Sequence, residues 1–279
     1  MSAVVDKLSA MQADLRERDG VLVAFSGGVD SGVVAAVAHD VLGDDAVACT
    51  AKSETLPAAE LEAAIDLAEE IGIRHELVSF SELDSESFRR NDDNRCYHCR
   101  QMRLGRMIET ARNLGISIVC DGTNASDPGS GHRPGLKAVE ELDAYSPLRA
   151  HDITKPEVRA IAEEYGLSVA DKPSMACLSS RIPTGLEVTE ARLTRVERAE
   201  ALLRTWGFSQ FRVRDHDGLA RIEIAQDELA VALDVAFAEA VREHFEDLGF
   251  DHVTLDLHGY QTGSVSPASP AYQGDSPDS

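Results

Sequence analysis

Residues 26–31 form the first stretch whose residue types could do chemistry. They read Ser-Gly-Gly-Val-Asp-Ser and directly follow an apolar run typical of a strand. Two glycines allow a tight turn that presents backbone N–H groups, and a helix N-terminus adds positive potential, so the loop suits a phosphate. Ser26 and Ser31 can donate hydroxyl hydrogen bonds, whereas Asp30 would repel a phosphate unless a divalent cation lay between them.

Three cysteines form the second group. Cys96 and Cys99 have the Cys-x-x-Cys spacing, which can form half a zinc site, a redox dithiol or part of an iron–sulfur site. No second such pair and no paired His motif completes a zinc tetrahedron. With Cys177 as a third thiolate, the group could hold a [4Fe–4S] cluster by three irons and leave the fourth iron open for an extra sulfide. A partly buried pair without a ligand is the alternative.

Helices and strands alternate along the first 170 residues. Short apolar runs at 21–25, 46–51, 76–80 and 117–120 predict strands covered on both faces. Five amphipathic stretches each end in a glycine followed by an apolar residue, as helices with a left-handed cap do: Gly72, Gly115, Gly166, Gly207 and Gly249. This alternation predicts an α/β fold, a Rossmann-like parallel sheet with helices on both faces.

The pattern changes after Gly185. A helix over 189–206, strands over 210–214 and 219–225, a helix over 227–248 and a strand over 252–257 predict a smaller C-terminal α+β domain. We therefore expect a first domain at residues 1–185, a second at 186–260, and a disordered tail rich in Ser, Pro and Gly at 261–279.

Composition narrows the class of protein. Acidic residues number 49 against 27 basic ones, a net charge of −22, so a nucleic-acid polyanion is a poor partner unless arginines cluster locally. Only five of the basic residues are lysines, and such an acidic surface suits a salt-rich cytosol, an ordinary acidic protein being the alternative. With neither a signal peptide nor a membrane-spanning apolar run, we expect a cytoplasmic protein without a membrane segment.

The remaining two cysteines, Cys49 and Cys120, have no predicted chemical role. Five cysteines are an odd number for a disulfide framework, and Cys49 and Cys120 lie inside strand-like runs. We predict that both are small buried hydrophobic residues.

The phosphate loop resembles a known signature. A Walker loop is excluded because no Gly-Lys-Ser/Thr follows the glycines, and a simple capped turn is the plain alternative. The string is similar to the SGGxDS signature of the PP-loop ATP pyrophosphatase superfamily. Its members cleave ATP between the α and β phosphates, adenylylate a substrate oxygen and release pyrophosphate. Residues 121–127 resemble the second superfamily element, which would place Gly122, Thr123 and Asp127 with Ser26, Gly27, Gly28, Asp30 and Ser31 at ATP and Mg²⁺.

Further motifs resemble one family within that superfamily. The stretch Cys177-x-x-x-Arg-x-Pro-x-Gly, with residues 133–138, 212–214 and 220–223, is similar to the LarE family over about residues 5 to 260. LarE proteins are ATP-dependent sulfur transferases of nickel-pincer cofactor assembly. The resemblance implies that ATP adenylylates a carboxylate of pyridinium-3,5-biscarboxylic acid mononucleotide, and that sulfur then displaces AMP to leave a thiocarboxylate.

The same resemblance implies roles for individual residues. Cys177 matches the sulfur-handling cysteine, and the pair Cys96 and Cys99 matches the branch in which a [4Fe–4S] cluster is thought to supply sulfide repeatedly, rather than Cys177 being consumed. Arg212 and Arg214 alternate on one strand and match the substrate-phosphate site, with Arg181 assisting. Glu200 and Glu223 match acidic positions near that site, where they could bind a divalent cation. A further acidic position is expected near Val231 but is apolar here, which speaks against this metal role.

Other functions remain open on the sequence alone. A tRNA thiolase of the same superfamily would need a broad cationic surface, and an amide-forming synthetase of the NAD-synthetase type would not require the three cysteines. A zinc or iron–sulfur scaffold without catalysis would leave the phosphate loop unexplained. For the sulfur transferase we expect a small-molecule nucleotide substrate, no nucleic-acid partner, a homo-oligomer, and hand-over to nickel-inserting and lactate-racemase-type proteins.

Overall fold

The protein divides into two compact units, each made of more than one segment. The computed structural model describes residues 2–127, 134–173 and 176–261. The first unit comprises residues 1–82 and 96–175, and the second comprises 83–95 and everything from 176 onward. The second unit therefore begins before the domain boundary predicted at 186, and the predicted domains stay a prediction. The predicted tail lies, from residue 262 on, outside the described residues.

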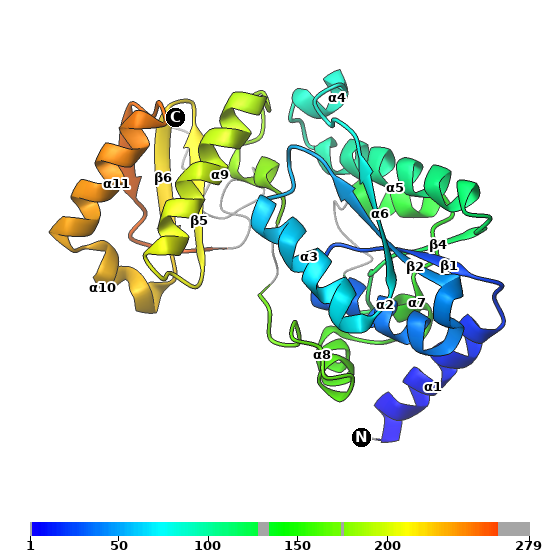
Figure 1. Cartoon of the computed structure of the whole chain (residues 1–279). Helices are drawn as coiled ribbons and strands as arrows, with labels where there is room; N and C mark the ends of the chain where they lie inside the picture. The colour runs from blue at the N-terminus through cyan, green and yellow to red at the C-terminus, as the bar shows by residue number, and fades with distance from the viewer. Residues whose placement is uncertain (1, 128–133, 174–175, 262–279) are drawn as a thin grey trace, which may run out of the picture. The chain divides into compact units, whose positions relative to one another are not determined.

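The first unit alternates helices and strands as its sequence pattern predicts (Figure 1). Its elements are α1 (Ser2–Arg16), β1 (Val21–Ala24), α2 (Val29–Leu42), η1 (Gly43–Asp45), β2 (Ala46–Lys52), α3 (Ala58–Ile71), β3 (Arg74–Ser79), α5 (Arg95–Asn113, its first residue in the second unit), β4 (Ile118–Cys120), α6 (Pro134–Glu141), α7 (Pro147–Ala150) and α8 (Lys155–Glu164).

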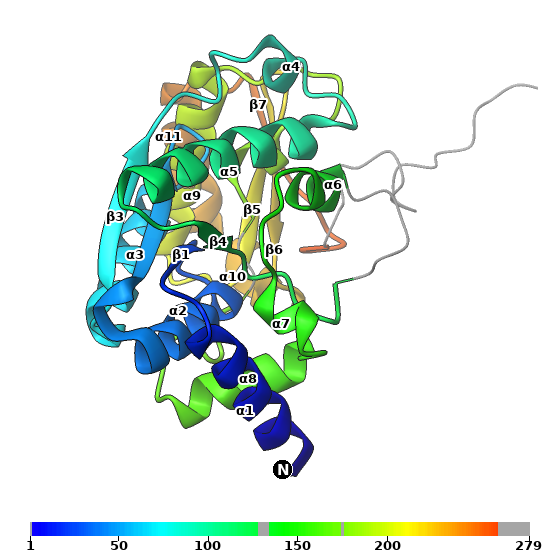
Figure 2. The ribbon, with the colours of Figure 1, turned by 90° about the vertical axis from the view of Figure 1, so that its right-hand side faces the viewer.

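These strands form a four-stranded parallel sheet in the order β3-β2-β1-β4, which confirms the predicted fold class. Successive residues of β1 are buried on opposite faces. Val21 and Val23 pack in a core with α1, α2, α3 and α8, whereas Leu22 packs in a second core with α5 and α6. Figure 2 shows α5 and α6 on one side of the sheet and α1, α2 and α8 on the other.

The helices end where the glycines predict. All five of these glycines have a positive φ, 78° at Gly72, where the backbone N–H groups of Gly72 and Ile73 both donate to the Ala68 carbonyl oxygen. An L-residue at such a position would be strained, so glycine fixes both the end of the helix and the direction of the following strand.

The second unit contains a small mixed sheet. Its elements are α4 (Glu86–Arg89), η2 (Leu178–Arg181), α9 (Glu190–Thr205), β5 (Phe211–His216), β6 (Leu219–Ile224), η3 (Gln226–Glu228), α10 (Leu229–Ala232), α11 (Val235–Asp247) and β7 (His252–Leu255). Strands β5 and β6 are antiparallel, and β7 pairs in parallel with β6. Val213 and Ile222 lie on the face that packs against α9 and α11.

The helix predicted over 227–248 is wrong as a single element. The chain leaves the helical conformation after Ala232, and the Asp234 carboxylate accepts a hydrogen bond of 2.8 Å from the Ala236 backbone N–H. Aspartate is a strong N-cap residue, so it starts a new helix at this point.

Asn91 is one of the residues that tie the segment 83–95 to the rest of the second unit. This side chain is fully buried, and its Nδ2 donates to the carbonyl oxygens of Pro183 and Leu186, both at 2.7 Å. Its own carbonyl oxygen accepts from the Gly185 backbone N–H at 2.9 Å. A single asparagine thus pairs with several backbone groups of a loop that has no secondary-structure partner for them.

No helix within the described residues is both long and apolar enough to cross a membrane.

Candidate active site

The loop after β1 and the loop after β4 line one pocket in the first unit. Because β1 and β4 are neighbours and parallel, their carboxyl ends bring residues 26–31 and 121–127 together. The pocket has a volume of about 210 Å³, and Ser26, Asp30, Ser31, Gly122, Thr123 and Asp127, all predicted from the sequence, line it. The structure therefore brings the two predicted ATP-binding elements into one place.

Glycine is required at two points of this pocket. Gly27 has a φ of 71°, and a Cβ there would lie 2.8 Å from the Ala64 Cα of α3. A Cβ on Gly122 would lie 2.9 Å from the Ser31 backbone nitrogen. Gly27 thus lets the first loop lie against α3, and Gly122 lets the second loop lie against the start of α2.

Ser26, Ser31 and the N-terminus of α2 lie at the pocket. Ser26 Oγ and Ser31 Oγ lie 3.0 Å apart, and the helix α2 begins after Gly28, which provides no side-chain cap. Uncapped N–H groups at a helix N-terminus are suited to an anion such as phosphate.

Asp30 is held by two side chains from distant parts of the chain. Asn124 Nδ2 donates to Asp30 Oδ1 at 2.9 Å, and Lys155 Nζ lies 2.5 Å from Asp30 Oδ2. Lys155 was not predicted as a site residue, although it is one of only five lysines. It stands at the first position of α8, whose start places it beside the loop.

Asp121 organises the other wall of the pocket. It accepts hydrogen bonds from Thr123 Oγ1 and Ser146 Oγ, each at 2.6 Å, and Arg100 Nη2 lies 3.6 Å away. Arg100 also lines the pocket and supplies a partly exposed positive charge there. Neither Arg100 nor Ser146 was predicted, because their part in the pocket depends on tertiary contacts with Asp121.

Cys96 and Cys99 lie on the first turn of α5, three residues apart and therefore on one side of the helix. Cys96 is exposed, whereas the half-buried Cys99 donates from Sγ to Glu82 Oε1 at 2.9 Å. Glu82 is fully buried, and it also accepts from Arg103 Nε at 2.9 Å. Burial alone would raise the pKa of Glu82, but the Arg103 charge and these hydrogen bonds outweigh it and lower the pKa.

Cys177 belongs to the second unit, so the structure describes it separately from Cys96 and Cys99. The sharing of one cluster by the three thiols stays a prediction. Among the described residues, no group of three or more His, Cys, Asp or Glu is arranged to hold a metal ion. Cys177 is half-buried and precedes the short helix η2, and its Sγ lies 3.0 Å from Ser179 Oγ.

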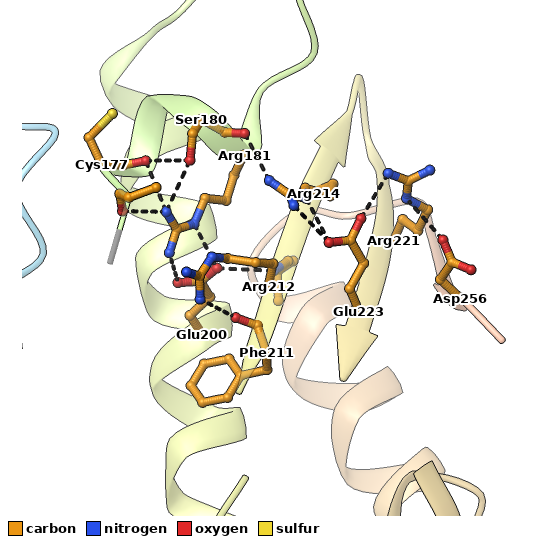
Figure 3. A network of polar contacts seen from close by, with 12 residues as sticks. Cys177, Ser180, Arg181, Glu200, Phe211, Arg212, Arg214, Arg221, Glu223 and Asp256 are labelled. Carbon is orange, nitrogen blue, oxygen red and sulfur yellow. Dashed lines mark hydrogen bonds and ion pairs between the residues drawn. The ribbon is translucent and has the colours of Figure 1, made fainter. Parts of the chain in front are cut away.

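The arginines predicted to hold phosphate lie on β5, and both are buried (Figure 3). Arg214 donates from Nε and Nη2 to Glu223 Oε2 at 3.0 and 2.7 Å, and Arg221 donates to Glu223 Oε1 at 2.9 Å. Arg212 donates from Nη1 to the Phe211 carbonyl oxygen at 2.6 Å. Burial, and then the positive charge of Arg181, lowers the pKa of Arg212, as expected where positive charge is in local excess.

The acidic residues of this network pair with arginines. Glu223 lies between two guanidinium groups, and the Glu200 carboxylate accepts from Arg181 Nε and Nη2 at 2.9 and 3.0 Å. A divalent-cation role for Glu200 and Glu223 stays a prediction that these ion pairs do not favour. Arg181 has no exposed surface, so its predicted contact with a substrate phosphate is equally unsupported by its position.

Comparison with known proteins gives relatives over the whole chain and over parts of it. Residues 3–112 match the family described as NAD synthase. An uncharacterized protein of Synechocystis is 44% identical over 93% of this chain and 97% of its own length. The pyridinium-3,5-bisthiocarboxylic acid mononucleotide synthase of Lactiplantibacillus plantarum is 36% identical over 95% of this chain and 96% of its own length. A tRNA-specific 2-thiouridylase MnmA of Bradyrhizobium is 30% identical, over 64% of this chain and 54% of its own length.

The five cysteines should differ sharply in reactivity. Burial raises the pKa of both Cys49 and Cys120 from 9.0 to about 12, so at pH 8.5 their thiolate population falls by about three orders of magnitude. We expect iodoacetamide at pH 8.5 to label Cys96 and to spare Cys49 and Cys120 in the folded protein, as peptide mass spectrometry will show. All five should react in urea, and labelling of Cys49 or Cys120 without urea would contradict their burial.

Proposed function

The chain belongs to the LarE family, that of the pyridinium-3,5-bisthiocarboxylic acid mononucleotide synthases, and we propose that it is an ATP-dependent sulfur transferase acting on a pyridinium dicarboxylate mononucleotide. The observation that carries the proposal is that, in the second unit, Cys177 and the buried arginines of β5 share one polar network (Figure 3). Such a network offers a sulfur atom close to a binding site for a phosphate-bearing substrate. The match to the synthase extends over both units, whereas the thiouridylase matches over only part of its length.

The first step of the proposed reaction belongs to the pocket of the first unit. A substrate carboxylate oxygen attacks the α-phosphate of ATP, the bond between the α and β phosphates breaks, and pyrophosphate leaves. Ser26, Ser31 and the N-terminus of α2 would bind phosphate oxygens, and Lys155 supplies a further positive charge beside Asp30. The carboxylates of Asp30 and Asp127 line the pocket and suit a Mg²⁺ ion, which would neutralise phosphate charge.

In the second step sulfur displaces AMP. The carboxylate has become an acyl adenylate with a good leaving group, so a sulfur nucleophile attacks its carbonyl carbon and the bond to AMP breaks. If Cys177 is that nucleophile, a thioester forms. Removal of the Cα proton then breaks the Cβ–S bond, which leaves the thiocarboxylate on the substrate and dehydroalanine in the protein.

A [4Fe–4S] cluster would supply sulfide without consuming Cys177. The positions of Cys96 and Cys99 on one side of α5 fit two ligands of such a cluster, and Cys177 would be the third. In the structure Cys99 donates its thiol hydrogen to Glu82, so ligation would replace this hydrogen bond. We further propose the nickel-pincer cofactor pathway as the destination of the product, with nickel-inserting and racemase-type proteins as recipients.

The proposal is tested by the products formed from ATP and the pyridinium dicarboxylate mononucleotide. We expect pyrophosphate release that requires this nucleotide, and a product whose mass shows a carboxylate oxygen replaced by sulfur. Asp30→Ala should abolish both, because the pocket loses the carboxylate that Asn124 and Lys155 hold in place, whereas Asp44→Ala on the exposed η1 should change neither. Sulfur transfer to tRNA, or amide formation from ammonia, in place of the expected product would refute the proposal.

Binding of the substrate phosphate should depend on Arg212. Losing a charge-assisted contact costs about 1.5–3 kcal/mol, so Arg212→Ala should raise the KM for the nucleotide about 10- to 150-fold. The KM for ATP should stay within twofold, as should both values in Arg242→Ala, which removes an exposed arginine of the same unit. An equal loss of ATP affinity in the Arg212 variant would show that this residue does not belong to a separate site for the substrate phosphate.

The three cysteines distinguish the two sulfur sources. If they share a cluster, replacing any one of Cys96, Cys99 or Cys177 by Ala should remove iron and stop multiple turnover, and combined replacements should cost little more. Anaerobic purification with iron and sulfide assays measures this, and Cys49→Ala is the matched control. Loss of the mass of hydrogen sulfide from Cys177 after turnover would instead show that the cysteine is consumed.

A further inference from the structure

Arg181 is the largest fully buried side chain among the described residues, and all three nitrogens of its guanidinium group donate to protein oxygens. Nε and Nη2 donate to the two carboxylate oxygens of Glu200, and Nη1 donates to the carbonyl oxygens of Ala176 and Cys177 at 2.5 and 2.9 Å. A group with no exposed surface, whose three nitrogens already donate to protein oxygens, is poorly placed to bind a substrate phosphate.

The backbone of Cys177 receives an unusual number of these contacts. Its carbonyl oxygen accepts from Arg181 Nη1 at 2.9 Å, from the Ser180 backbone N–H at 3.0 Å and from Ser180 Oγ at 2.7 Å. Three donors around one oxygen fix the orientation of that peptide group, and with it the direction of the Cα–Cβ bond. Figure 3 shows the Cys177 sulfur pointing away from the guanidinium group that holds its carbonyl oxygen.

The same residues fasten this turn to the strand that carries the arginines. Glu200 Oε1 accepts from the Val213 backbone N–H of β5 at 3.0 Å as well as from Arg181. Arg214 Nη1 donates to the Ser180 carbonyl oxygen at 2.9 Å. The turn of Cys177 is thus bound to β5 at two points, through Glu200 and through Arg214.

We propose that Arg181, with Glu200, is a positioning residue that sets the separation between the Cys177 sulfur and the phosphate-binding Arg212, and that it takes no part in binding the substrate phosphate. This role rests on the proposed function and differs from the phosphate contact predicted for Arg181 from the sequence. Its effect falls on sulfur transfer, because that step needs the sulfur within reach of a carbonyl carbon whose position the bound phosphate fixes. A displacement of about 1 Å can cost such a step about 100-fold.

The test compares Arg181→Lys with Arg195→Lys. Arg195 is a matched control, since it also pairs with a fully buried carboxylate, Asp215, and donates to a carbonyl oxygen, that of Gly249, without contacting the Cys177 turn. In anaerobically purified holoenzyme, Arg181→Lys should slow sulfur transfer about 10- to 100-fold in a single turnover. Pyrophosphate release and the KM for the nucleotide should stay within twofold, and Arg195→Lys should change none of the three.

A second measurement needs no substrate. Releasing the turn should make Cys177 at least threefold faster to alkylate with iodoacetamide, with Cys96 unchanged as the internal reference. If Cys177 is alkylated faster in Arg181→Lys but the wild-type protein makes no thiocarboxylate, the positioning role is upheld and the proposed function is refuted. An unchanged Cys177 rate, a raised KM for the nucleotide, or equal effects of Arg181→Lys and Arg195→Lys would overturn the inference.

A lysine leaves the buried Glu200 only partly paired, and that variant could fail to fold. The double variant Arg181→Met/Glu200→Gln then replaces it, because it removes both charges and keeps an amide oxygen for the Val213 N–H. The same loss of sulfur transfer and the same gain in Cys177 labelling are expected, and their absence would equally overturn the inference.

Discussion

The buried ion pair between Arg181 and Glu200 is the interaction on which the order of the second unit's polar network depends. Taking two charges out of water costs several kcal/mol per ion, and the pair alone does not offset this cost. Here Arg181 also donates to backbone carbonyl groups around Cys177, and Glu200 also accepts from the Val213 N–H. The charges therefore link a turn, a helix and an edge strand, in addition to the apolar core that α9 and β5 share.

The first unit meets a different constraint, the geometry of a parallel sheet. Strands β1 and β4 are far apart in the sequence but adjacent in the sheet, so the loops that follow them end at the same edge. Gly122 lets the second loop approach the start of α2, where Asn124 reaches Asp30, and Gly27 lets the first loop pack against α3. The phosphate chemistry follows from this placement more than from any single residue.

Much of this arrangement could be predicted from the sequence, because it depends on local rules. Gly72 and the other helix-ending glycines act through their own backbone, and the apolar strands of a parallel sheet are recognisable without their partners. What could not be predicted depends on distant contacts. Lys155 acquires a role only because α8 begins beside Asp30, and the pairing of Arg181 is visible only once Glu200 and the carbonyl groups are in place. The break before Asp234 had a local signal, its N-cap, that the helical periodicity concealed.

The segment of residues 83–95 has a consequence for how this architecture could have arisen. Asn91 satisfies carbonyl groups of residues 183 and 186, so the second unit is incomplete without a piece of chain that lies inside the first. Fusing two genes end to end would not produce such a connection. A premature stop that removes the C-terminal half would leave the segment 83–95 without the rest of its unit. Exchanging the C-terminal part alone would leave these carbonyl groups without the Asn91 side chain, so an exchange must carry the inserted segment with it.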